Sequence, residues 1–574
     1  MFSFSAAFAT GAGQSKVPCT GTVVHSSDNI VSIINAGKSG QTFCIEGEHR
    51  ISAPIHVRTG QTLIGTTTNS RISGAVEIGP WQATSTRGVY YYDGAYANTA
   101  PNQMETYSGS NVCYWVTTYM DDVFFRTTGT NDQRVMRVLS QNEVNPTQPI
   151  TTQGQAVTAG EAGRFYFDYS ANRIYLSLPN DRDPNSATVD LAIPLSGSGS
   201  NPLIAGAGQT NVTLQNLFIE KTMQYGIIAG TGWNLQNVTV RFAHGIGAYQ
   251  LQGTIADPAT VNETLFTENG QLGLTAGQST NLSITNSEMS WNNIANFRQT
   301  SGQTGSGQCA GYHDAGAFHI YHLQGTATQP AVSINNLWSH NNVADGSWSD
   351  GGTQYTQITN STFNGNERHG YYHEISCQIN FSGNTLYGNG YALKNWDLPG
   401  GGLNINDSND GTFESNLIYG NDAGFAVHLT YQTYHPDMLS NACLGAKNDT
   451  DTTNALKDNQ ILSNTVYTCA ALASVGKAWA MGGTLNSRGN EYQSNNYHLS
   501  DSTSNWFADS NGNQFEPMAW SAWQGGEHDS EGSLSVGCEY GEMRLRPHRP
   551  RRPDIEHHTP ERPDPIQFSS RLDN

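Results

Sequence analysis

Two acidic residues, Asp350 and Glu374, occupy equivalent places in the segments DGSWSDGG and HGYYHEIS, each four residues after a glycine. If the interval between them, about 24 residues, makes one turn of a solenoid of parallel strands, the two side chains lie on adjacent strands about 4.8 Å apart. Two carboxyl groups about 5 to 5.5 Å apart are the arrangement of a retaining glycosidase, whereas an inverting enzyme needs about 6.5 to 9.5 Å. Two like charges this close also raise the pKa of one of them, which supplies a proton donor. The spacing therefore predicts that Asp350 and Glu374 are catalytic residues acting on a glycosidic bond.

The glycines before these acids recur, and they predict one column of side chains along the solenoid. Aligning them at positions 346, 370, 402 and 424 gives a column of four polar residues: Asp350, Glu374, Asn406 and His428. In earlier coils the same offset gives Gly230 and Leu274. We therefore expect the polar stripe to begin only in the later half of the solenoid.

Aromatic and amide residues accompany the two acids. Trp348 and Tyr372 lie two residues before them and so on the same face of a strand, and Trp396 with Asp397 begins a loop beside them. Other side chains could form hydrogen bonds with sugar hydroxyls: His319, His373, Asn404, Asn406 and His428. Each also has a simpler interpretation as a solvated residue or as one member of a ladder. Taken together, they predict a substrate-binding site for a carbohydrate.

The histidines and cysteines do not indicate a metal site. His369 and His373 would share one face of a helix, but Gly370, Tyr371 and Tyr372 between them favour a strand, on which they would lie roughly 13 Å apart. The cysteines include no CxxC pair. We therefore expect neither a metal ion nor another cofactor.

Asparagines recur at regular intervals through the middle of the chain, in segments such as TLQNLFIE, NLQNVTV and TVNETLF. The aligned residues are Asn216, Asn237, Asn262, Asn286, Asn336, Asn360, Asn384, Asn416 and Asn464. The interval between them recurs as one unit, with longer separations where a coil lacks the asparagine or carries an inserted loop. Such a period, about 24 residues, is typical of a parallel β-helix, in which each asparagine occupies the same turn of successive coils and bonds to its neighbours.

The composition agrees with an all-β fold. The 574 residues include 61 Gly, while charged residues make up only 13% and aromatic residues 10%. Good helix formers do not dominate, and low charge with many aromatics argues against general disorder. The net charge of −20 argues against binding of nucleic acid, which needs a positive surface. The sequence contains no run of 18 apolar residues, so we expect no membrane-spanning segment.

The composition and the strand pattern change along the chain, and these changes predict four parts. Residues 17–80 are expected to form N-terminal β-helix coils, and 81–195 an inserted β-rich domain of sandwich or barrel type. The aromatics of that domain are more consistent with a core than with a sugar platform. Residues 196–535 are expected to form the main β-helix with the catalytic groove. The tail, 541–574, contains six Pro and seven Arg and is expected to be disordered.

Cysteine positions suggest an exported protein. Cys19 with Cys44 and Cys443 with Cys469 are candidate disulfides, although buried free thiols are equally consistent with the sequence. The first eight residues, MFSFSAAF, are apolar but lack a basic segment, which fits a truncated secretory signal. We expect an extracellular, monomeric protein whose partner is a polysaccharide or oligosaccharide.

Several longer segments resemble a known superfamily. FCIEGEHRISAPIHVRTGQTLIG, SGAVEIGPW, DDVFFR and RFYFDYSANRIYLS, together with SWSDGG, HGYYHEIS and AWQGGEHDS, are similar to bacterial right-handed parallel β-helix proteins of the pectate-lyase-like superfamily. The resemblance covers most of residues 17–535. Within it, the β-xylosidase-like retaining enzymes, a β-helix with an added β-sandwich, have a similar plan. The resemblance implies an Asp nucleophile and a Glu acid/base on adjacent coils, which Asp350 and Glu374 match by type, order and separation.

Two other functions stay open. A polysaccharide lyase or epimerase could use the same fold, with Arg368 or Lys394 as the nearby base, although an acidic protein has little to attract a polyuronide. The clustered motifs of polygalacturonases are absent. A non-catalytic adhesin or carbohydrate-binding fibre would need only the long flat face of the solenoid.

Overall fold

The computed structural model describes residues 17–94, 120–127, 132–138, 140–148, 163–195, 202–277, 280–295, 298–300, 309–312, 315–390, 400–421, 425–430, 443, 456–468, 475–476, 484–511, 514–526 and 528–538. The predicted tail, 541–574, and the predicted site residue Trp396 lie outside these ranges.

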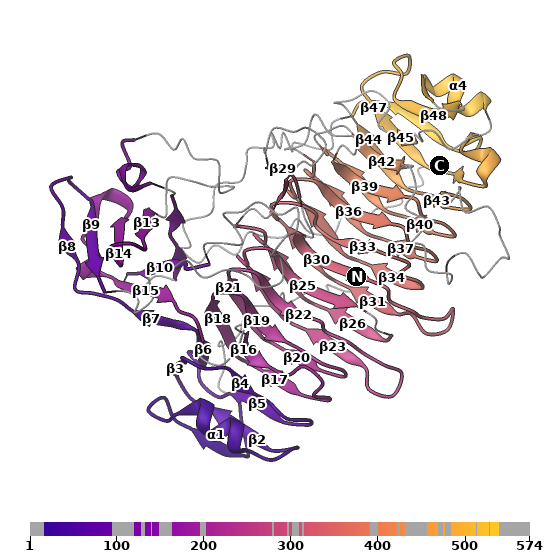
Figure 1. The fold of residues 1–574 in the computed structure, drawn as a ribbon. Helices are drawn as coiled ribbons and strands as arrows, with labels where there is room; N and C mark the ends of the chain where they lie inside the picture. Colours follow the sequence, from indigo (N-terminus) through magenta and orange to yellow (C-terminus); the bar gives the residue numbers. More distant parts are fainter. Residues whose placement is uncertain are drawn as a thin grey trace, which may run out of the picture.

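Short strands stack into three long sheets that wind around a common axis, so the chain forms a parallel β-helix (Figure 1). Sheet A contains β1 (Thr22–Val24), β2 (Thr42–Ile45), β5 (Thr62–Gly65), β17 (Thr213–Gln215), β20 (Asn234–Gln236), β23 (Ala259–Asn262), β26 (Leu282–Thr285), β31 (Val332–Asn335), β34 (Thr356–Thr359), β37 (Asn380–Ser382), β40 (Thr412–Glu414), β43 (Gln460–Leu462) and β46 (Glu491–Gln493). Sheet B contains β3 (Glu48–Arg50), β6 (Arg71–Ser73), β18 (Phe218–Thr222), β21 (Thr239–Ala243), β24 (Leu265–Thr267), β27 (Glu288–Ser290), β32 (Trp338–His340), β35 (Thr362–Asn364), β38 (Thr385–Tyr387), β41 (Leu417–Tyr419), β44 (Thr465–Thr468), β47 (Asn496–Leu499) and β50 (Ser533–Val536).

The third sheet carries the predicted polar stripe. Sheet C contains β4 (Ile55–His56), β16 (Pro202–Ala205), β19 (Tyr225–Ile228), β22 (Ile246–Tyr249), β25 (Leu272–Gly277), β30 (Gly316–Tyr321), β33 (Trp348–Asp350), β36 (His369–Glu374), β39 (Gly401–Asn406), β42 (Phe425–Thr430), β45 (Val475–Gly476), β48 (Phe507–Asn511) and β49 (Gln514–Met518). Neighbouring strands pair in parallel, except that β49 turns back antiparallel to β48. The predicted all-β solenoid of stacked coils is confirmed.

The interior of the solenoid is filled mainly by apolar side chains that stack in columns. In sheet A the middle residues stack in register as Leu63, Leu214, Leu235, Val261 and Ile284, and all are fully buried. Because side chains alternate along a strand, the residues on either side of each of these point outward. This alternation decides which side chains of a coil can meet a substrate.

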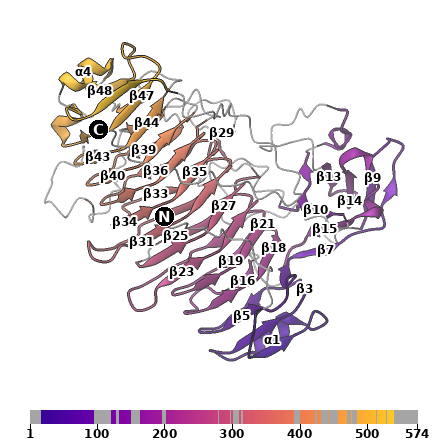
Figure 2. The ribbon, with the colours of Figure 1, turned by 180° about the vertical axis from the view of Figure 1, so that it is seen from behind.

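Helices close the two ends of the solenoid. α1 (Ile30–Ala36) begins after Asn29, whose side chain accepts a hydrogen bond from the backbone N–H of Ser32, and it buries Ile30 and Ile34 against the first coils. α4 (Trp520–Gly525) buries Trp523 at the other end, and Figures 1 and 2 show the two helices at opposite ends. Such caps cover the terminal strand edges of a solenoid. The short 3₁₀ turns are η2 (Gln141–Val144), η3 (Pro179–Asp181), η4 (Pro184–Ser186) and η5 (Asn486–Arg488).

The predicted single asparagine column is three adjacent columns in the structure. Five of the nine asparagines are left-handed at the turn between sheets A and B: Asn216, Asn237, Asn286, Asn336 and Asn360. Asn262 instead precedes the left-handed Glu263, and Asn384, Asn416 and Asn464 follow left-handed Gly383, Ser415 and Ser463. The last three point inward and bond to the next coil. The prediction of one column was wrong because asparagine suits more than one of these positions: the left-handed one for its tolerance of positive φ, and the inward one after it for its amide.

A second asparagine ladder lies at the turn between sheets B and C, and the sequence alignment did not predict it. It runs through Asn269, Asn292, Asn342, Asn366, Asn389 and Asn421, with amide-to-amide distances of 2.9 to 3.0 Å. This turn directly precedes the strands of sheet C, whose outward side chains form the polar stripe. The ladder therefore fixes the coil spacing next to the polar stripe.

We expect Asn416→Ala to lower the free energy of unfolding by about 2 to 3 kcal/mol. The buried Asn416 amide donates to Phe381 O (3.0 Å) and to Asn464 Oδ1 (2.9 Å), and its Oδ1 accepts from the backbone N–H of Asn384 (2.9 Å). Alanine leaves these buried groups unsatisfied. Denaturant unfolding measures the loss, and Asn360→Gly, at an exposed left-handed position, should change stability by less than about 0.5 kcal/mol. Equal losses in both variants would contradict a ladder that stabilises the solenoid.

Between β6 and β16 the chain leaves the solenoid and forms two further sheets. One contains β7 (Ala75–Glu77), β10 (Val123–Arg126), β11 (Gln133–Arg134) and β15 (Thr188–Ala192); the other contains β8 (Gln82–Ala83), β9 (Tyr90–Asp93), β12 (Met136–Arg137), β13 (Arg164–Asp168) and β14 (Arg173–Ser177). We call these strands the two-sheet unit; both figures show it beside the early coils. β6 pairs directly with β18 and β5 with β17, so the solenoid continues across the excursion. Its first strand, β7, begins before residue 81, and 81–195 stays the proposed extent of an inserted domain.

The aromatics of the two-sheet unit divide between a core and its surface. Phe124, Phe165 and Phe167 are buried, and Phe124 contacts Phe242 of the solenoid with ring centroids 5.0 Å apart. Tyr91 and Tyr166 are partly exposed. The predicted core is therefore present, and it extends into the β-helix. A separate pair of strands, β28 (Arg298–Thr300) and β29 (Cys309–Tyr312), lies within the insertion before β30.

Two disulfides link cysteines within the described part of the chain. The predicted Cys19–Cys44 bond is confirmed. The predicted Cys443–Cys469 bond is wrong, because Cys443 bonds to Cys377, with Cα atoms 5.7 Å apart. Cys377 follows β36 closely, so the solenoid brings together cysteines that lie 66 residues apart in sequence. Among the described helices, none is long and apolar enough to cross a lipid bilayer.

Candidate active site

Asp350 and Glu374 occupy the outer face of sheet C on adjacent strands. β33 and β36 pair so that Trp348 is opposite Tyr372 and Ser349 opposite His373, which puts Asp350 level with Glu374. The column continues to Tyr321 on one side and to Asn406 on the other. Neighbouring strands lie about 4.8 Å apart. The two carboxylates are thus neighbours in one outward column, as their spacing in the sequence predicted, and their catalytic roles stay a prediction.

Glu374 is partly buried and held by two donors. Its Oε1 accepts hydrogen bonds from the Tyr372 hydroxyl (2.6 Å) and the Asn406 amide (3.0 Å). Burial and then the charge of Asp350 raise the pKa of Glu374 to about 7, against the opposing effects of Tyr372, Arg368 and Asn406. At neutral pH this carboxyl therefore exists in both protonation states, which suits a group that must give and take a proton.

Asp350 has different surroundings. Its Oδ1 accepts a 2.6 Å hydrogen bond from the backbone N–H of Gly351, and Nε2 of His319 lies 3.4 Å from its Oδ2. Gly351 and Gly352 both have positive φ and turn the chain sharply after β33. A carboxylate oxygen fixed by a backbone donor beside a partly protonated acid gives two carboxyls with two distinct environments.

Aromatic rings form a ladder beside the acids. His319 stacks on Trp348 with centroids 4.1 Å apart, and Trp348 stacks on Tyr372 at 5.8 Å. The prediction that Trp348 and Tyr372 share the face of the acids is confirmed by their register. Among the described residues, none accepts a hydrogen bond from the buried Nε1–H of Trp348. Unsatisfied buried donors are rare, so this group is a candidate partner for an oxygen atom of a ligand.

Three residues beside the acids were not among the predicted site residues: Asp345, Arg368 and His369. The buried Asp345 accepts from Arg368 Nη1 at Oδ2 (2.9 Å) and from His369 Nδ1 at Oδ1 (2.8 Å). Nε2 of His369 in turn accepts from the Asn404 amide (3.2 Å), so the network assigns His369 its neutral, Nδ1-protonated form. Asp345 and His369 are separated by one coil in the sequence, and that spacing was the signal that could have found them.

A family model matches part of the chain. Residues 204–441 fit the model described as the right handed beta helix region. The chain has the fold of a right-handed parallel β-helix. Among solved structures, the complex of XylC with xylose is similar with a TM-score of 0.56 and 13% identity, covering 88% of this chain and 82% of that one. At this identity the likeness shows the fold alone. No curated protein matches the sequence.

Two further structures are more distantly similar to this β-helix protein. The Azotobacter vinelandii mannuronan C-5 epimerase AlgE6 A-module has a TM-score of 0.35 and 10% identity, covering 80% of this chain and 93% of that one. The Yersinia enterocolitica family 28 exopolygalacturonase has a TM-score of 0.31 and 11% identity, covering 84% of this chain and 72% of that one.

His373 lies inside the β-helix, not at the surface. It is fully buried, its Nδ1 is 2.7 Å from Ser349 Oγ, and its ring contacts Tyr371 and Phe413. Burial lowers the pKa of His373 to about 3, so the ring stays neutral. The expectation that it binds a sugar is corrected: side chains alternate along β36, and the residue between Tyr372 and Glu374 must point inward.

The glycine alignment placed two other members of the column wrongly. His428 pairs with Asn404, and the residue opposite Asn406 is Thr430. In the early coils Leu274 pairs with Phe318, while Gly277 and Tyr321 continue the column of Asp350. The glycines are not equivalent in every coil, because Gly401 and not Gly402 aligns with the start of β42. Asn404 and Asn406 themselves lie on the same sheet as predicted, next to His369 and Glu374.

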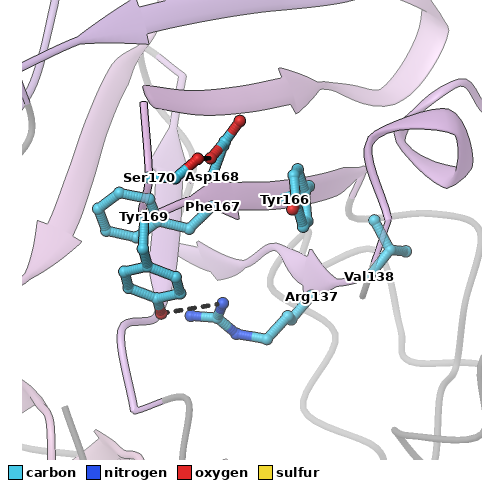
Figure 3. Close-up of a pocket in the computed structure, with 7 residues that line it drawn as sticks. All are labelled: Arg137, Val138, Tyr166, Phe167, Asp168, Tyr169 and Ser170. Carbon is cyan, nitrogen blue, oxygen red and sulfur yellow. Dashed lines mark hydrogen bonds between the residues drawn. The ribbon is translucent and has the colours of Figure 1, made fainter. Parts of the chain in front are cut away.

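A pocket of the β-helix protein lies in the two-sheet unit, away from the strands of the polar stripe. This pocket of about 260 Å³ is lined by Arg137, Val138, Tyr166, Phe167, Asp168, Tyr169 and Ser170 (Figure 3). Arg137 donates to the Tyr169 hydroxyl (3.4 Å) and to Asp121 O, and its guanidinium lies 4.6 Å from the Phe165 ring centroid. The cation is thus already engaged by the unit's own residues. Within the described ranges, no group of three His, Cys, Asp or Glu side chains could hold a metal ion.

Proposed function

We propose that the protein is a carbohydrate-active enzyme, a glycoside hydrolase that retains the configuration of the anomeric carbon. The observation that carries this proposal is the pair Asp350 and Glu374 in one outward column on adjacent coils, with the pKa of Glu374 raised to about 7. The carboxyl spacing of adjacent strands suits a retaining mechanism better than an inverting one. Similarity in fold to the complex of XylC with xylose is consistent with a saccharide substrate.

In the first step protonated Glu374 donates its proton to the glycosidic oxygen as Asp350 attacks the anomeric carbon. The leaving group departs as an alcohol, and Asp350 becomes a glycosyl ester. In the second step the Glu374 carboxylate takes a proton from water, whose oxygen bonds to the anomeric carbon and releases the Asp350 carboxylate. Glu374 is then protonated again, so protons balance over the cycle.

The site's other groups would bind the sugar. The ring of Trp348 and its Nε1–H, with Tyr372, Asn404, Asn406 and His319, offer an aromatic surface and hydrogen-bond partners on one face. We propose a polysaccharide or oligosaccharide as substrate. Trp396 and His428 stay candidates whose side chains the structure does not describe. The disulfides Cys19–Cys44 and Cys377–Cys443 support a secreted protein, since such bonds persist in oxidising compartments.

The test is an activity screen on neutral aryl glycosides and polysaccharides, with proton NMR of the first product formed. Retention of the substrate's anomeric configuration is expected. An inverted first product would contradict the nucleophile role of Asp350. An unsaturated uronate product would instead indicate a lyase, and binding without turnover a non-catalytic surface protein.

The pH profile gives a prediction specific to Glu374. Its raised pKa means that the acid form is lost as the pH rises through about 7, so kcat/KM should fall tenfold per pH unit above that value. Tyr372→Phe removes a hydrogen bond that favours the carboxylate, so it should move this alkaline limb to higher pH. Tyr91→Phe, in the two-sheet unit, is the matched control. A limb that stays in place in Tyr372→Phe would mean that another group controls it.

A further inference from the structure

We propose that the buried Asp345–Arg368 ion pair is a positioning element for Glu374: Arg368 braces Tyr372, and Asp345 anchors Arg368 and balances its charge. This inference rests on the proposed acid/base role of Glu374. It adds Asp345 and Arg368, which do not touch the substrate and act only on Tyr372 and Glu374. We therefore call them positioning residues and not catalytic ones.

A chain of contacts connects Asp345 to Glu374. Arg368 Nη1 donates to Asp345 Oδ2 (2.9 Å), and the guanidinium carbon lies 4.8 Å from the centroid of the Tyr372 ring. The Tyr372 hydroxyl donates to Glu374 Oε1 (2.6 Å). The Nε of Arg368 is buried and makes no hydrogen bond to any residue that the structure describes. Arg368 is therefore held by one carboxylate and one aromatic ring, and both contacts orient the donor of Glu374.

The same carboxylate also holds the other side of the site. Asp345 Oδ1 accepts from His369, whose Nε2 accepts from the Asn404 amide. The His369 ring lies 4.6 Å from that of Tyr372. One buried anion thus organises both Tyr372 and Asn404, which lie opposite each other on β36 and β39.

The charges around Glu374 come from several elements. Asp350 faces it from β33, with His319 of β30 beside that acid. Tyr372 and Arg368 face it from its own coil, and Asn406 from β39; Asp345 and His369 lie behind Arg368. Asp350 favours the protonated form of Glu374, and Arg368 favours the ionised form.

Asp345 and Arg368 act as fixed charges over the range in which Glu374 titrates. Burial opposes ionisation of Asp345, but Arg368 and His369 outweigh it and lower the pKa of Asp345. Burial likewise opposes the charge of Arg368, yet Asp345, Tyr372 and Glu374 raise the pKa of Arg368. Removing the cation should therefore raise the pKa of Glu374, and removing the anion, which exposes Glu374 to an unbalanced cation, should lower it.

The experiment measures the titration of Glu374 directly, by carbon-13 NMR of protein labelled at the Glu side-chain carboxyls, with Glu374→Gln for assignment. The pH dependence of kcat/KM is measured in parallel. Arg368→Met should shift the pKa of Glu374 upward by on the order of one unit, and Asp345→Asn downward by a similar amount. Arg368→Lys keeps the charge and should leave the titration close to that of the wild type. Arg87→Met, at an exposed arginine of the two-sheet unit, should change nothing.

Opposite shifts are the signature that a merely structural ion pair would not produce. Unchanged or same-direction shifts in folded Arg368→Met and Asp345→Asn would overturn the proposal. If Asp345→Asn does not fold, Arg368→Met is compared with Arg368→Lys. A shift of the pKa of Glu374 in Arg368→Met alone supports the positioning role of Arg368, and no shift in either variant contradicts it. The NMR shifts do not depend on turnover, so opposite shifts without hydrolysis would remove the proposed function and leave the positioning element. Hydrolysis without shifts would do the reverse.

Discussion

Glu374→Gln is expected to lower kcat/KM by roughly 10² to 10⁴ on glycosides with poor leaving groups, because the variant cannot protonate the departing oxygen. Glutamine keeps the shape of the side chain and an oxygen that can accept from Tyr372 and Asn406, so folding should be preserved. The loss should be much smaller on a dinitrophenyl glycoside, whose leaving group needs no proton. Steady-state kinetics on a matched pair of such substrates separates the two cases.

Asp350→Asn should lower kcat/KM more severely, by about 10⁴-fold or more on both kinds of substrate, since no glycosyl ester can form.

Added azide should restore turnover in Glu374→Ala and in Asp350→Ala, and the two products should have opposite anomeric configurations. Glu374→Ala should give a glycosyl azide of retained configuration, and Asp350→Ala one of inverted configuration. The control, Glu491→Gln on the exposed face of sheet A, should match the wild type. Wild-type rates in both Glu374→Gln and Asp350→Asn would refute the assignment.

Lys221→Met should lower the free energy of unfolding by about 3 to 5 kcal/mol, because it removes the cation that lies between the buried carboxylates of Asp132 and Asp190. Lys221 is only 1% exposed, and its Nζ lies 2.7 Å from Asp132 Oδ1 and 2.6 Å from Asp190 Oδ2. Both acids belong to the two-sheet unit, whereas Lys221 belongs to β18 of the solenoid. The cluster is therefore the charged part of the junction between them.

The remaining cations cannot fully replace Lys221. Arg50 contacts Asp190 (2.7 Å), while Arg241 contacts Asp132 (3.2 Å) and Glu220 (2.7 Å). Burial opposes ionisation of Asp190, but Lys221 and Arg50 outweigh it and lower the pKa of Asp190. Its contribution to stability is thus present at neutral pH and is lost as the pH falls below the usual range of an aspartate.

Denaturant unfolding and hydrogen exchange measure the effect of Lys221→Met. Exchange should accelerate first in β10, β15 and β18, the strands that meet at the cluster. Lys38→Met, at an exposed lysine, should stay within about 0.5 kcal/mol of the wild type. If Lys221→Met were as stable as Lys38→Met, the apolar contacts of this junction, such as Phe124 with Phe242, would suffice to hold it.

Residues that repeat once per coil were readable from the sequence. The spacing of Asp350 and Glu374 became one step of a parallel sheet, and Trp348 and Tyr372 followed by alternation. The same one-coil spacing relates Asp345 to His369 and Asn404 to His428, but alignment on glycines hid both pairs. Hydrogen-bonded register, not the identity of a turn residue, decides which side chains are level.

The sequence by itself determined the period of the fold, since a repeat this short, about 24 residues, can bury its apolar positions only by stacking on copies of itself. It also determined which acids are neighbours, because adjacent coils are adjacent repeats. Only the tertiary structure decided the rest: that His373 points inward, that Cys443 meets Cys377, and that Asp345 and Arg368 stand behind Tyr372. These depend on inserted loops of unequal length and on the direction of each side chain. A spacing in sequence specifies neither.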